Sequence, residues 1–358
     1  MSSVVPTPPP TWVLLGPKAG DNNQVLALAE ALGWPFEARN IHNRPWELLT
    51  NLLAGPSLLG MDRRRSSALL PPWPALVISA GRRNEPVARW IRRQSGGRAR
   101  LVHIGRPWAS PAAFDLIVTT TQYFLPEAGN VLCNRLPLHR IDAERSRAEA
   151  AMLAPELAAL PGPRTLVLLG GDSGSFVFTA AKARRLAAEV DRLVAAYGGT
   201  VLVTDSRRTP AAASAAFRAA LRAPGRFFAW SDPGPSRYLA LLGSADRLVL
   251  TAESMSMLAE ALSLRKPLHL FSLHDPQPWW RHRHAWRTKP LSHRLAMAWG
   301  PRRMRRDVMR LLELVVAEDR ARWLGEPPPP APEPAAPIAA PRTDLERATQ
   351  RVRALFGQ

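Results

Sequence analysis

Residues 251–271, TAESMSMLAEALSLRKPLHLF, contain the segment that decides the fold. An apolar strand at 247–250 runs into a turn of small residues at 251–254, and a helix follows. Lys266-Pro267 ends that helix before a second strand at 268–271. This order predicts one βαβ unit of a parallel sheet. The turn leaves backbone N–H groups at the start of the helix, where proteins commonly hold phosphate.

Glu260 adds a carboxylate to the same helix. A carboxylate there can accept hydrogen bonds from the hydroxyl groups of a sugar, so the turn and Glu260 together indicate a nucleotide-sugar site. An ordinary βαβ unit whose helix is capped by Ser254 explains the segment equally well without a ligand.

The alternation of strand, polar loop and helix runs through both halves of the chain. It predicts an α/β fold with two Rossmann-like, doubly wound domains. Open α/β sheets bind ligands at the carboxyl ends of their strands, so we expect two such edges facing a cleft. The predicted strands are 12–15, 75–78, 101–104, 116–118, 165–169, 200–203, 226–230, 247–250 and 268–271. Helices are predicted at 22–32, 85–94, 179–197, 210–221, 235–242, 308–324 and 343–356.

Length and composition set the expected domain boundaries. A chain of 358 residues favours two domains, and Pro161-Gly162-Pro163 is typical of a hinge. The Pro-rich start and a Pro/Ala-rich stretch near the end are typical of disordered or flexible chain. The expected parts are a disordered lead-in at 1–10, an N-terminal acceptor-side domain at 11–158, a hinge at 159–163, a C-terminal nucleotide-sugar-binding domain at 164–325, a linker at 326–342 and a terminal helix at 343–358.

Charge favours anionic partners. The chain has 48 Lys and Arg residues against 29 Asp and Glu, a formal net charge of +19. The basic, Trp-rich stretch at 279–310 predicts peripheral contact with the inner membrane surface. A solvated basic face explains this stretch as well, and nucleic acid, which rests on charge alone, is not expected as a partner.

Cysteine content and hydropathy indicate the compartment. Cys133 is the only cysteine, so no intramolecular disulfide is possible, as fits a reducing environment. The N-terminus lacks the pattern of a signal peptide, and no apolar run approaches the roughly 18 residues of a membrane span. We expect a cytoplasmic protein.

Three strand ends of the second half carry small and polar side chains suited to a nucleotide-sugar donor. Glycine lets backbone N–H groups approach a phosphate, and arginine can pair with a diphosphate in a fork. A glycine turn without a ligand and a solvated helix start are the alternatives, and neither a dinucleotide fingerprint nor a Walker P-loop is present. The predicted donor-binding residues are Gly170, Gly171, Asp172, Ser173, Ser206, Arg207, Arg208, Thr251, Ser254, Ser256 and Glu260.

The first half offers a base and cations for an acceptor. Asp21 follows the first strand, where it can either cap the next helix or act as a general base on an acceptor hydroxyl. Later strand ends carry arginines that suit an acidic acceptor, whereas His103 is interpreted as a core histidine. The predicted acceptor-binding residues are Asn22, Arg82, Arg83 and Arg106.

Neither a metal nor a cofactor is predicted. His282 and His284 lack an acidic or thiol partner nearby, and no Asp-x-Asp pair is present to hold a divalent ion on a sugar diphosphate. We therefore expect arginine and helix N-termini to stabilise the charge of the leaving group.

Taken in order, these motifs resemble the mitochondrial-fission Elm family. The resemblance covers about residues 12–323 and implies a GT-B fold and, for bacterial members, glycosyltransferase activity. Six motifs carry it: GDNNQ at 20–24, SAGRR at 79–83, IGRP at 104–107, LGGD at 169–172, TDSRRT at 204–209 and TAESMSM at 251–257.

A more distant likeness is to the peptidoglycan lipid-linked N-acetylglucosaminyltransferase. In such enzymes a Glu on the helix before Gly-x-Pro binds the donor ribose, and Glu260, seven residues before Pro267, falls at the matching place. Arg265-Lys266 stands where the usual Gly would be, and Thr-Ala-Glu-Ser at 251–254 replaces Ser-Gly. Asp21 is similar to the Asp of the first-loop Gly-Asp in heptosyltransferases, a candidate base.

These observations predict a metal-independent GT-B glycosyltransferase. It would move a sugar from a nucleotide-sugar donor to an envelope glycolipid such as lipopolysaccharide core. A nucleotide-sugar epimerase on the same fold and a non-catalytic membrane-associated scaffold are the alternatives.

Overall fold

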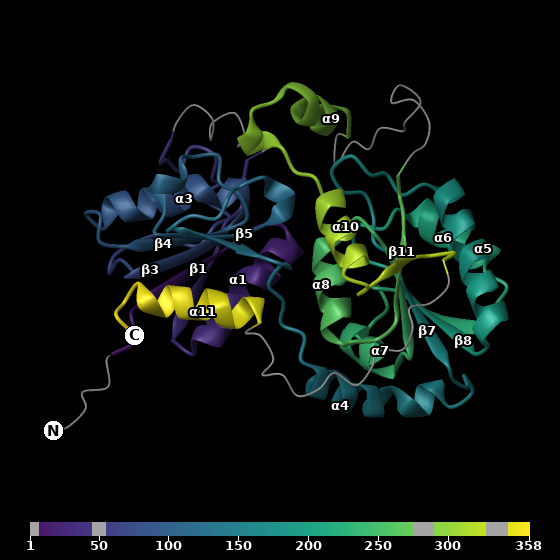
Figure 1. The fold of residues 1–358 in the computed structure, drawn as a ribbon. Coiled ribbons are helices and arrows are strands. Elements are labelled where there is room, and N and C mark those ends of the chain that lie inside the picture. The colour runs from purple at the N-terminus through teal and green to yellow at the C-terminus, as the bar shows by residue number, and fades with distance from the viewer. Residues whose placement is uncertain (1–6, 45–54, 275–289, 327–342) are drawn as a thin grey trace. The chain divides into compact units, whose positions relative to one another are not determined.

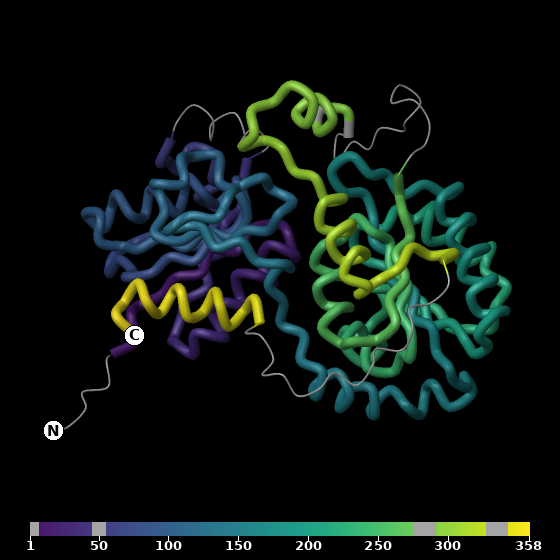
Figure 2. The backbone as a smooth tube through the Cα atoms, in the orientation of Figure 1, coloured from purple at the N-terminus to yellow at the C-terminus, as the bar shows by residue number. Residues whose placement is uncertain are grey.

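A computed structural model describes residues 7–44, 55–274, 290–326 and 343–358 (Figures 1 and 2). It divides into two compact units, each built on a six-stranded sheet in which all paired neighbours are parallel. The predicted α/β class with two doubly wound domains is confirmed. Among the described helices, none combines the length and apolarity that crossing a bilayer requires.

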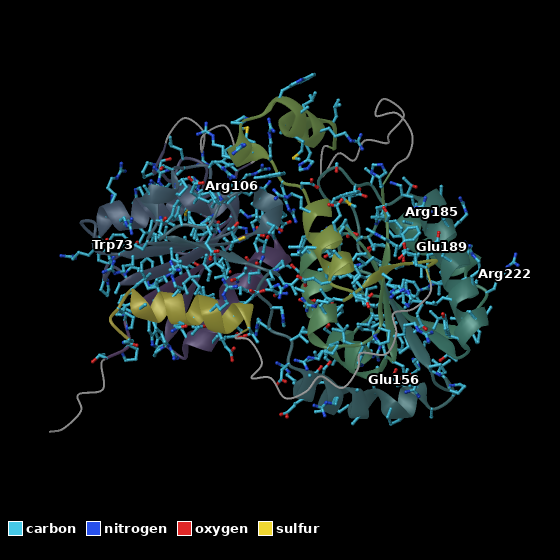
Figure 3. All side chains as sticks on the ribbon, viewed as in Figure 1. Trp73, Arg106, Glu156, Arg185, Glu189 and Arg222 are labelled. Atoms are coloured by element: carbon cyan, nitrogen blue, oxygen red, sulfur yellow. The ribbon has the colours of Figure 1, made fainter. Side chains whose placement is uncertain are left out.

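The first unit has its sheet in the order β2-β1-β3-β4-β5-β6. Apolar side chains cover both faces, with α1 and α11 packed on one and α3 on the other. On the α3 face, Trp73 packs edge-on against Trp12 and Trp90, with ring centroids 5.9 and 5.8 Å apart (Figure 3). The strands are β1 Thr11–Leu15, β2 Phe36–Asn40, β3 Leu76–Ala80, β4 Arg100–Ile104, β5 Leu116–Thr120 and β6 Val131–Asn134, and the helices are α1 Ala19–Leu32, α3 Gly81–Gln94 and α11 Asp344–Ala354.

The second unit has its sheet in the order β12-β11-β10-β7-β8-β9. The face of the sheet under α5 and α6 is filled by aliphatic side chains together with Phe178, Phe217 and Phe271. The strands are β7 Arg164–Leu168, β8 Thr200–Thr204, β9 Gly225–Phe228, β10 Arg247–Thr251, β11 Leu268–Phe271 and β12 Arg322–Trp323. The helices are α4 Ala143–Leu153, α5 Ala180–Tyr197, α6 Ala211–Ala220, α7 Tyr238–Ser244, α8 Met255–Ser263, α9 Pro290–Trp299 and α10 Met309–Ala317.

Three helix bounds differ from the prediction in ways that matter for the site. α1 and α3 begin at Ala19 and Gly81, so Asp21 and Arg82 lie in first helical turns rather than in loops. The helix predicted at 308–324 is wrong beyond Ala317, because the backbone turns left-handed at Asp319 (φ 55°) and then forms β12.

The division between the units falls between Arg140 and Ile141. α4 packs against α7, where the Ser146 hydroxyl donates to the carbonyl of Leu239 at 2.8 Å. Residues on both sides of 159–163 therefore lie within the second unit, and motion about that segment stays a prediction. Residues Pro301–Asp307 and the terminal helix belong to the first unit, whereas residues 1–6 of the lead-in, 279–289 of the basic stretch and 327–342 of the linker lie outside the described residues.

The terminal helix α11 packs along α1 (Figure 1). Thr343 and Glu346 form a reciprocal capping box at its start, and Ala348 and Val352 are fully buried. The Asp344 carboxylate accepts hydrogen bonds from the backbone N–H groups of Arg135 and Leu136 at 3.1 and 2.8 Å. The predicted helix thus forms part of the first unit's core.

We expect Gly243→Ala to destabilise the second unit by about 1–3 kcal/mol, the usual cost of overpacking. In an open helix this change is stabilising. Here a Cβ on Gly243 would overlap the backbone oxygen of Ser146 and press α4 away from α7. Urea denaturation measures the free energy of unfolding.

Gly129→Ala is the matched control, because a Cβ there meets nothing within 4 Å. Equal stability of the two variants would contradict the tight α4–α7 packing.

Candidate functional site

Each sheet reverses its direction of winding once, and the predicted site residues lie at those two places. In the first unit β1 has β2 on one side and β3 on the other, and in the second unit β7 lies between β8 and β10. The loops after the two strands that flank such a reversal diverge and leave a crevice at the carboxyl edge. Residues 16–21 and 80–84 border the reversal in the first unit, and 169–179 and 252–254 border it in the second.

Glu253 ties together three strand ends of the second unit. Its Oε1 accepts the N–H of Gly171 after β7 at 2.8 Å and lies 3.5 Å from the Arg208 guanidinium after β8. Its side chain has no exposed surface, whereas 38% of the Arg208 side chain is exposed. Burial raises the pKa of Glu253, an effect that the Arg208 charge and the Gly171 N–H only partly offset. The carboxylate therefore fixes a cation at the rim of the edge.

The sequence interpretation overlooked Glu253 as a separate site residue. It appeared there only as one letter of the TAES turn, because its partners lie 45 and 82 residues away in the chain. A charged residue directly after a buried strand was the available signal.

Gly170 and Gly171 serve close packing at this edge. Their N–H groups donate inside the protein, to the Thr251 hydroxyl and to Glu253, each at 2.8 Å. A Cβ on Gly170 would overlap Glu253, and one on Gly171 would overlap the backbone of Arg208. The amides of these two glycines are therefore engaged, which differs from the predicted use of the glycine pair as a phosphate cradle.

Further groups stand at the same edge. The Thr209 hydroxyl donates to the carbonyls of Leu169 and Gly170 and pairs with the Ser206 hydroxyl at 3.0 Å, so Ser206 is held next to the β7 end. Asp172 is half-buried, and its Oδ1 accepts the backbone N–H of Phe178 at 2.9 Å. Ser173 is bonded to Phe176 through the backbone, and Arg207 is exposed beside Arg208.

The start of α8 carries the donors that suit an anion. Ser254 is the N-cap residue, 7% exposed, and its side chain makes no capping hydrogen bond. Ser254 thus occupies the predicted cap position, but its hydroxyl forms no bond to the first turn of α8. Ser256 is the second residue of α8, within its first turn, and is half-buried. First-turn N–H groups of a helix have no partners within it, and the helix dipole favours negative charge there.

Glu260 lies further along α8 and is 7% exposed. Its Oε2 accepts the hydroxyl of Tyr238 at 2.7 Å, and burial raises the pKa of Glu260 despite this bond. One carboxylate oxygen is thus occupied by Tyr238, which positions the group.

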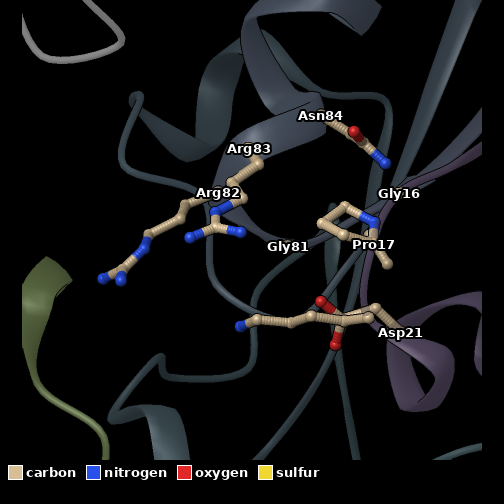
Figure 4. A pocket seen from close by; sticks show the side chains of 9 residues that line it. Gly16, Pro17, Asp21, Gly81, Arg82, Arg83 and Asn84 are labelled. Carbon is tan, nitrogen blue, oxygen red and sulfur yellow. The ribbon is translucent and has the colours of Figure 1, made fainter. Parts of the chain in front are cut away.

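In the first unit, the loops after β1 and β3 line a pocket (Figure 4). The Asp21 carboxylate and the Arg82 and Arg83 side chains surround the same opening. Gly81 is left-handed (φ 71°), and a Cβ there would lie only 2.7 Å from Oδ2 of Asp21. Glycine at this position therefore gives the carboxylate its room. The full lining is Gly16, Pro17, Lys18, Asp21, Ala80, Gly81, Arg82, Arg83 and Asn84.

Asp21 does not cap α1. The N-cap residue is Lys18, without a side-chain capping bond, and Asp21 lies in the first turn with no hydrogen-bond partner among the described residues. Asn22 instead holds the loop after β1, because its side-chain amide donates to the Gly16 carbonyl and accepts from the Gly16 N–H, at 2.8 and 2.9 Å. The helix-cap alternative for Asp21 is wrong, which leaves its carboxylate available to the pocket.

Cations gather around Asp21. The Asp21 charge raises the pKa of Lys18, but burial of the ammonium and the charges of Arg306, Arg82 and Arg83 outweigh it, so the pKa of Lys18 is lowered. Burial raises the pKa of Tyr123, whose ring lies 5.7 Å from the Arg306 guanidinium carbon. Arg306 comes from the segment Pro301–Asp307, far along the chain, and donates to the Gln122 side chain at 2.9 Å.

The remaining predicted residues of this unit lie apart from the pocket lining. Arg106 donates to the backbone carbonyl of Tyr123 at 2.6 Å and thus holds the neighbouring loop. His103 is completely buried and pairs with the Ser79 hydroxyl at 3.0 Å, and burial lowers its pKa to about 3. Its interpretation as a core histidine is confirmed. Within the described residues no group of three or more His, Cys, Asp or Glu side chains is arranged to hold a metal ion.

Comparisons with known proteins agree with the resemblance seen in the motifs. The model of the family described as "Mitochondrial fission ELM1" matches residues 19–323. The mitochondrial fission protein ELM1 of Arabidopsis thaliana is 28% identical over 219 residues, which are 55% of this chain and 51% of that protein. The chain thus spans about half the length of that relative. An uncharacterised protein of Rickettsia prowazekii (strain Madrid E) is 21% identical over 300 residues, covering 73% of this chain and 82% of that protein.

Among solved structures, the UDP-GlcNAc 2-epimerase from Methanocaldococcus jannaschii is similar in fold. The TM-score is 0.50 at 12% sequence identity, and the match covers 97% of this chain and 99% of that one. At this identity the likeness concerns the fold alone, and it agrees with the predicted GT-B-like architecture.

We expect the stability of Glu253→Gln relative to the wild type to improve as pH rises. Burial raises the pKa of Glu253 in the folded state above its ordinary 4.5, so on raising the pH the unfolded chain loses this proton first. Ionisation therefore favours the unfolded state between the two pKa values, and glutamine carries no such cost. Urea denaturation below pH 4.5 and at neutral pH measures the difference in the free energy of unfolding.

Glu313→Gln, on an exposed position of α10, controls for the loss of one carboxylate. A difference between Glu253→Gln and wild type that is the same at both pH values would contradict the assigned pKa direction.

Proposed function

This chain belongs to the mitochondrial fission ELM1 family, and we propose that it is a glycosyltransferase that moves a sugar from a nucleotide-sugar donor to an anionic glycolipid. The observation that carries the proposal is the edge of the second unit at β7 and β10. There the Arg208 guanidinium, held by buried Glu253, lies next to the uncapped start of α8. A diphosphate is recognised by this combination of a fixed cation and free helix N–H groups.

The donor would lie along the carboxyl edge of the second unit. Arg208 and the first turn of α8 would take the diphosphate, with the hydroxyls of Ser254 and Ser256 as further donors. Arg207 would add charge from the exposed side of the same turn. Glu260 is the proposed ribose ligand, because Tyr238 occupies only one of its two carboxylate oxygens.

Asp21 is the proposed general base in the first unit. The acceptor hydroxyl would attack the anomeric carbon of the donor sugar and pass its proton to Asp21. The bond from that carbon to the diphosphate would break with its electron pair going to the leaving oxygen, where Arg208 and the α8 dipole stabilise the charge without a metal. Lys18, Arg82 and Arg83 around Asp21 suit an acceptor with a phosphate or carboxylate, such as lipopolysaccharide core.

A donor should raise the melting temperature of the protein. We expect a thermal-shift screen of nucleoside diphosphates and nucleotide sugars to identify a stabilising ligand. Arg208→Gln should lower the affinity for that ligand about tenfold or more, because a charge-assisted hydrogen bond to phosphate is worth about 1.5–3 kcal/mol. The affinity of each variant is obtained by titrating the ligand and following the rise in melting temperature above that of the same variant without ligand.

Arg192→Gln, at an exposed position of α5, is the matched control and should bind as wild type. If Glu260 holds the ribose, Glu260→Ala should lower the affinity for nucleotides and leave the affinity for pyrophosphate unchanged. The absence of stabilisation by any nucleotide would favour a non-catalytic scaffold over an enzyme.

Asp21→Asn should reduce turnover by about 10²–10⁴-fold, the usual contribution of a general base, with little change in donor affinity. The measurement is donor consumption with and without a lipid acceptor fraction. Donor conversion that needs no acceptor would indicate an epimerase. Wild-type turnover of Asp21→Asn would show that Asp21 is not the general base. Urea denaturation of the variant shows whether its fold is intact.

A further inference from the structure

Helix α9 turns an apolar face outward. Leu291, Leu295 and Trp299 are spaced one turn apart and are 42%, 43% and 82% exposed. Ala298, between them on the same side, is exposed as well. A surface helix of a globular protein normally points its apolar stripe toward the core, so α9 has the reverse arrangement.

The opposite side of α9 contacts the second unit. The Arg294 guanidinium donates to the carbonyl of Ser175 at 3.2 Å, and the His293 ring lies 3.6 Å from the place a Cβ on Gly174 would take. His293 is roughly half a turn away from Leu295, since successive residues are about 100° apart. These contacts and the exposed Leu291, Leu295 and Trp299 show which side of α9 (labelled in Figure 1) faces the rest of the second unit.

The chain around α9 is strongly basic. Residues 279–310 contain ten Lys and Arg residues and a single acidic residue, Asp307. A basic sequence that flanks an apolar helix stripe is typical of helices that lie in the interface of a membrane with anionic lipids, and a Trp such as Trp299 suits the headgroup level. A second copy of this chain, with its net charge of +19, would be repelled from the same surface.

Other exposed apolar side chains lack this arrangement. Met152, Trp230, Leu59 and Leu70 are 82%, 54%, 61% and 66% exposed. They come from different parts of the chain and form no stripe along one helix. Single exposed apolar residues are normal on protein surfaces, so they carry no inference but supply controls.

We propose that α9 docks on an anionic lipid bilayer by inserting Leu291, Leu295 and Trp299 into the headgroup region, with the lipid charge attracting the basic chain that flanks α9 in the sequence. Because the inner side of α9 contacts Gly174 and Ser175, docking brings the carboxyl edge of the second unit next to the bilayer. If the proposed function holds, a lipid-linked acceptor then meets the donor at the membrane surface. The docking itself does not depend on that function.

Co-sedimentation of the full chain with vesicles tests the proposal. We expect binding to phosphatidylcholine vesicles that contain phosphatidylglycerol, weaker binding to phosphatidylcholine alone, and loss of binding at high salt. The triple variant L291S/L295S/W299S should lose about tenfold or more of its partitioning, because it removes the inserted apolar surface and keeps every cation.

M152S/W230S is the matched control, since it removes exposed apolar surface elsewhere and should bind as wild type. Anionic-vesicle binding by the triple variant equal to wild type would overturn the proposal. So would light scattering that shows a wild-type dimer and a monomeric triple variant, because a second copy would then cover the stripe. The rise in melting temperature caused by nucleotides should be the same in the triple variant as in wild type. This result would show that loss of vesicle binding is independent of the donor site.

Discussion

The structure depends on one constraint: parallel strands place all their carboxyl ends at a single edge, and each sheet changes its winding direction once. In the first unit the change falls between β1 and β3, and in the second between β7 and β10. Right-handed crossovers carry the chain to opposite faces on either side of such a point, so the two loops that leave it cannot fill the space between them. Both candidate sites lie there, although their sequences share no motif.

The second of these edges is held together by a carboxylate that is costly to bury. Glu253 has lost all contact with water, and the desolvation of such a group is offset only by good partners. Its partners come from two other strand ends, the N–H of Gly171 and the guanidinium of Arg208. One oxygen, Oε2, has no hydrogen-bond partner among the described residues. An arrangement that costs stability and points a cation at an edge is expected of a binding site rather than of a core.

The sequence predicted those strands that are buried on both faces. Runs such as Leu76–Ala80 and Arg247–Thr251 are apolar enough to be identified without knowing their neighbours. Three strands were missed. Phe36–Asn40 contains no apolar run, since Glu37, Arg39 and Asn40 are polar, the edge strand Val131–Asn134 is only four residues long, and Arg322–Trp323 is too short to show a period. The pairing of Glu253 with Arg208 was beyond sequence reasoning, since it depends on which strands lie side by side.

The departure at Arg265-Lys266 from the usual Gly also has a local cause. Arg265 adopts the left-handed conformation (φ 53°) in which helices commonly end on glycine, at some cost in strain. Lys266 donates to the carbonyls of Leu242, Gly243 and Ala245 and so closes the end of α7. Lys266 thus joins the chain after α8 to the end of α7.

The two edges hold their charges in opposite ways. In the second unit Oε1 of Glu253 is bonded to Gly171 and Arg208, and the Arg208 cation lies at the rim. In the first unit the Asp21 carboxylate lines the pocket together with Lys18, Arg82 and Arg83. Asp21 raises the pKa of Lys18, but desolvation of the ammonium and, as smaller causes, the charges of Arg306, Arg82 and Arg83 together exceed this opposing effect, so the pKa of Lys18 is lowered. An anion bound beside Lys18 would relieve the repulsion and raise the pKa of Lys18 again, and by linkage the protonated lysine would bind that anion more tightly. Binding of an anion next to the Asp21 carboxylate would therefore be favoured, as the proposed acidic acceptor and general base require.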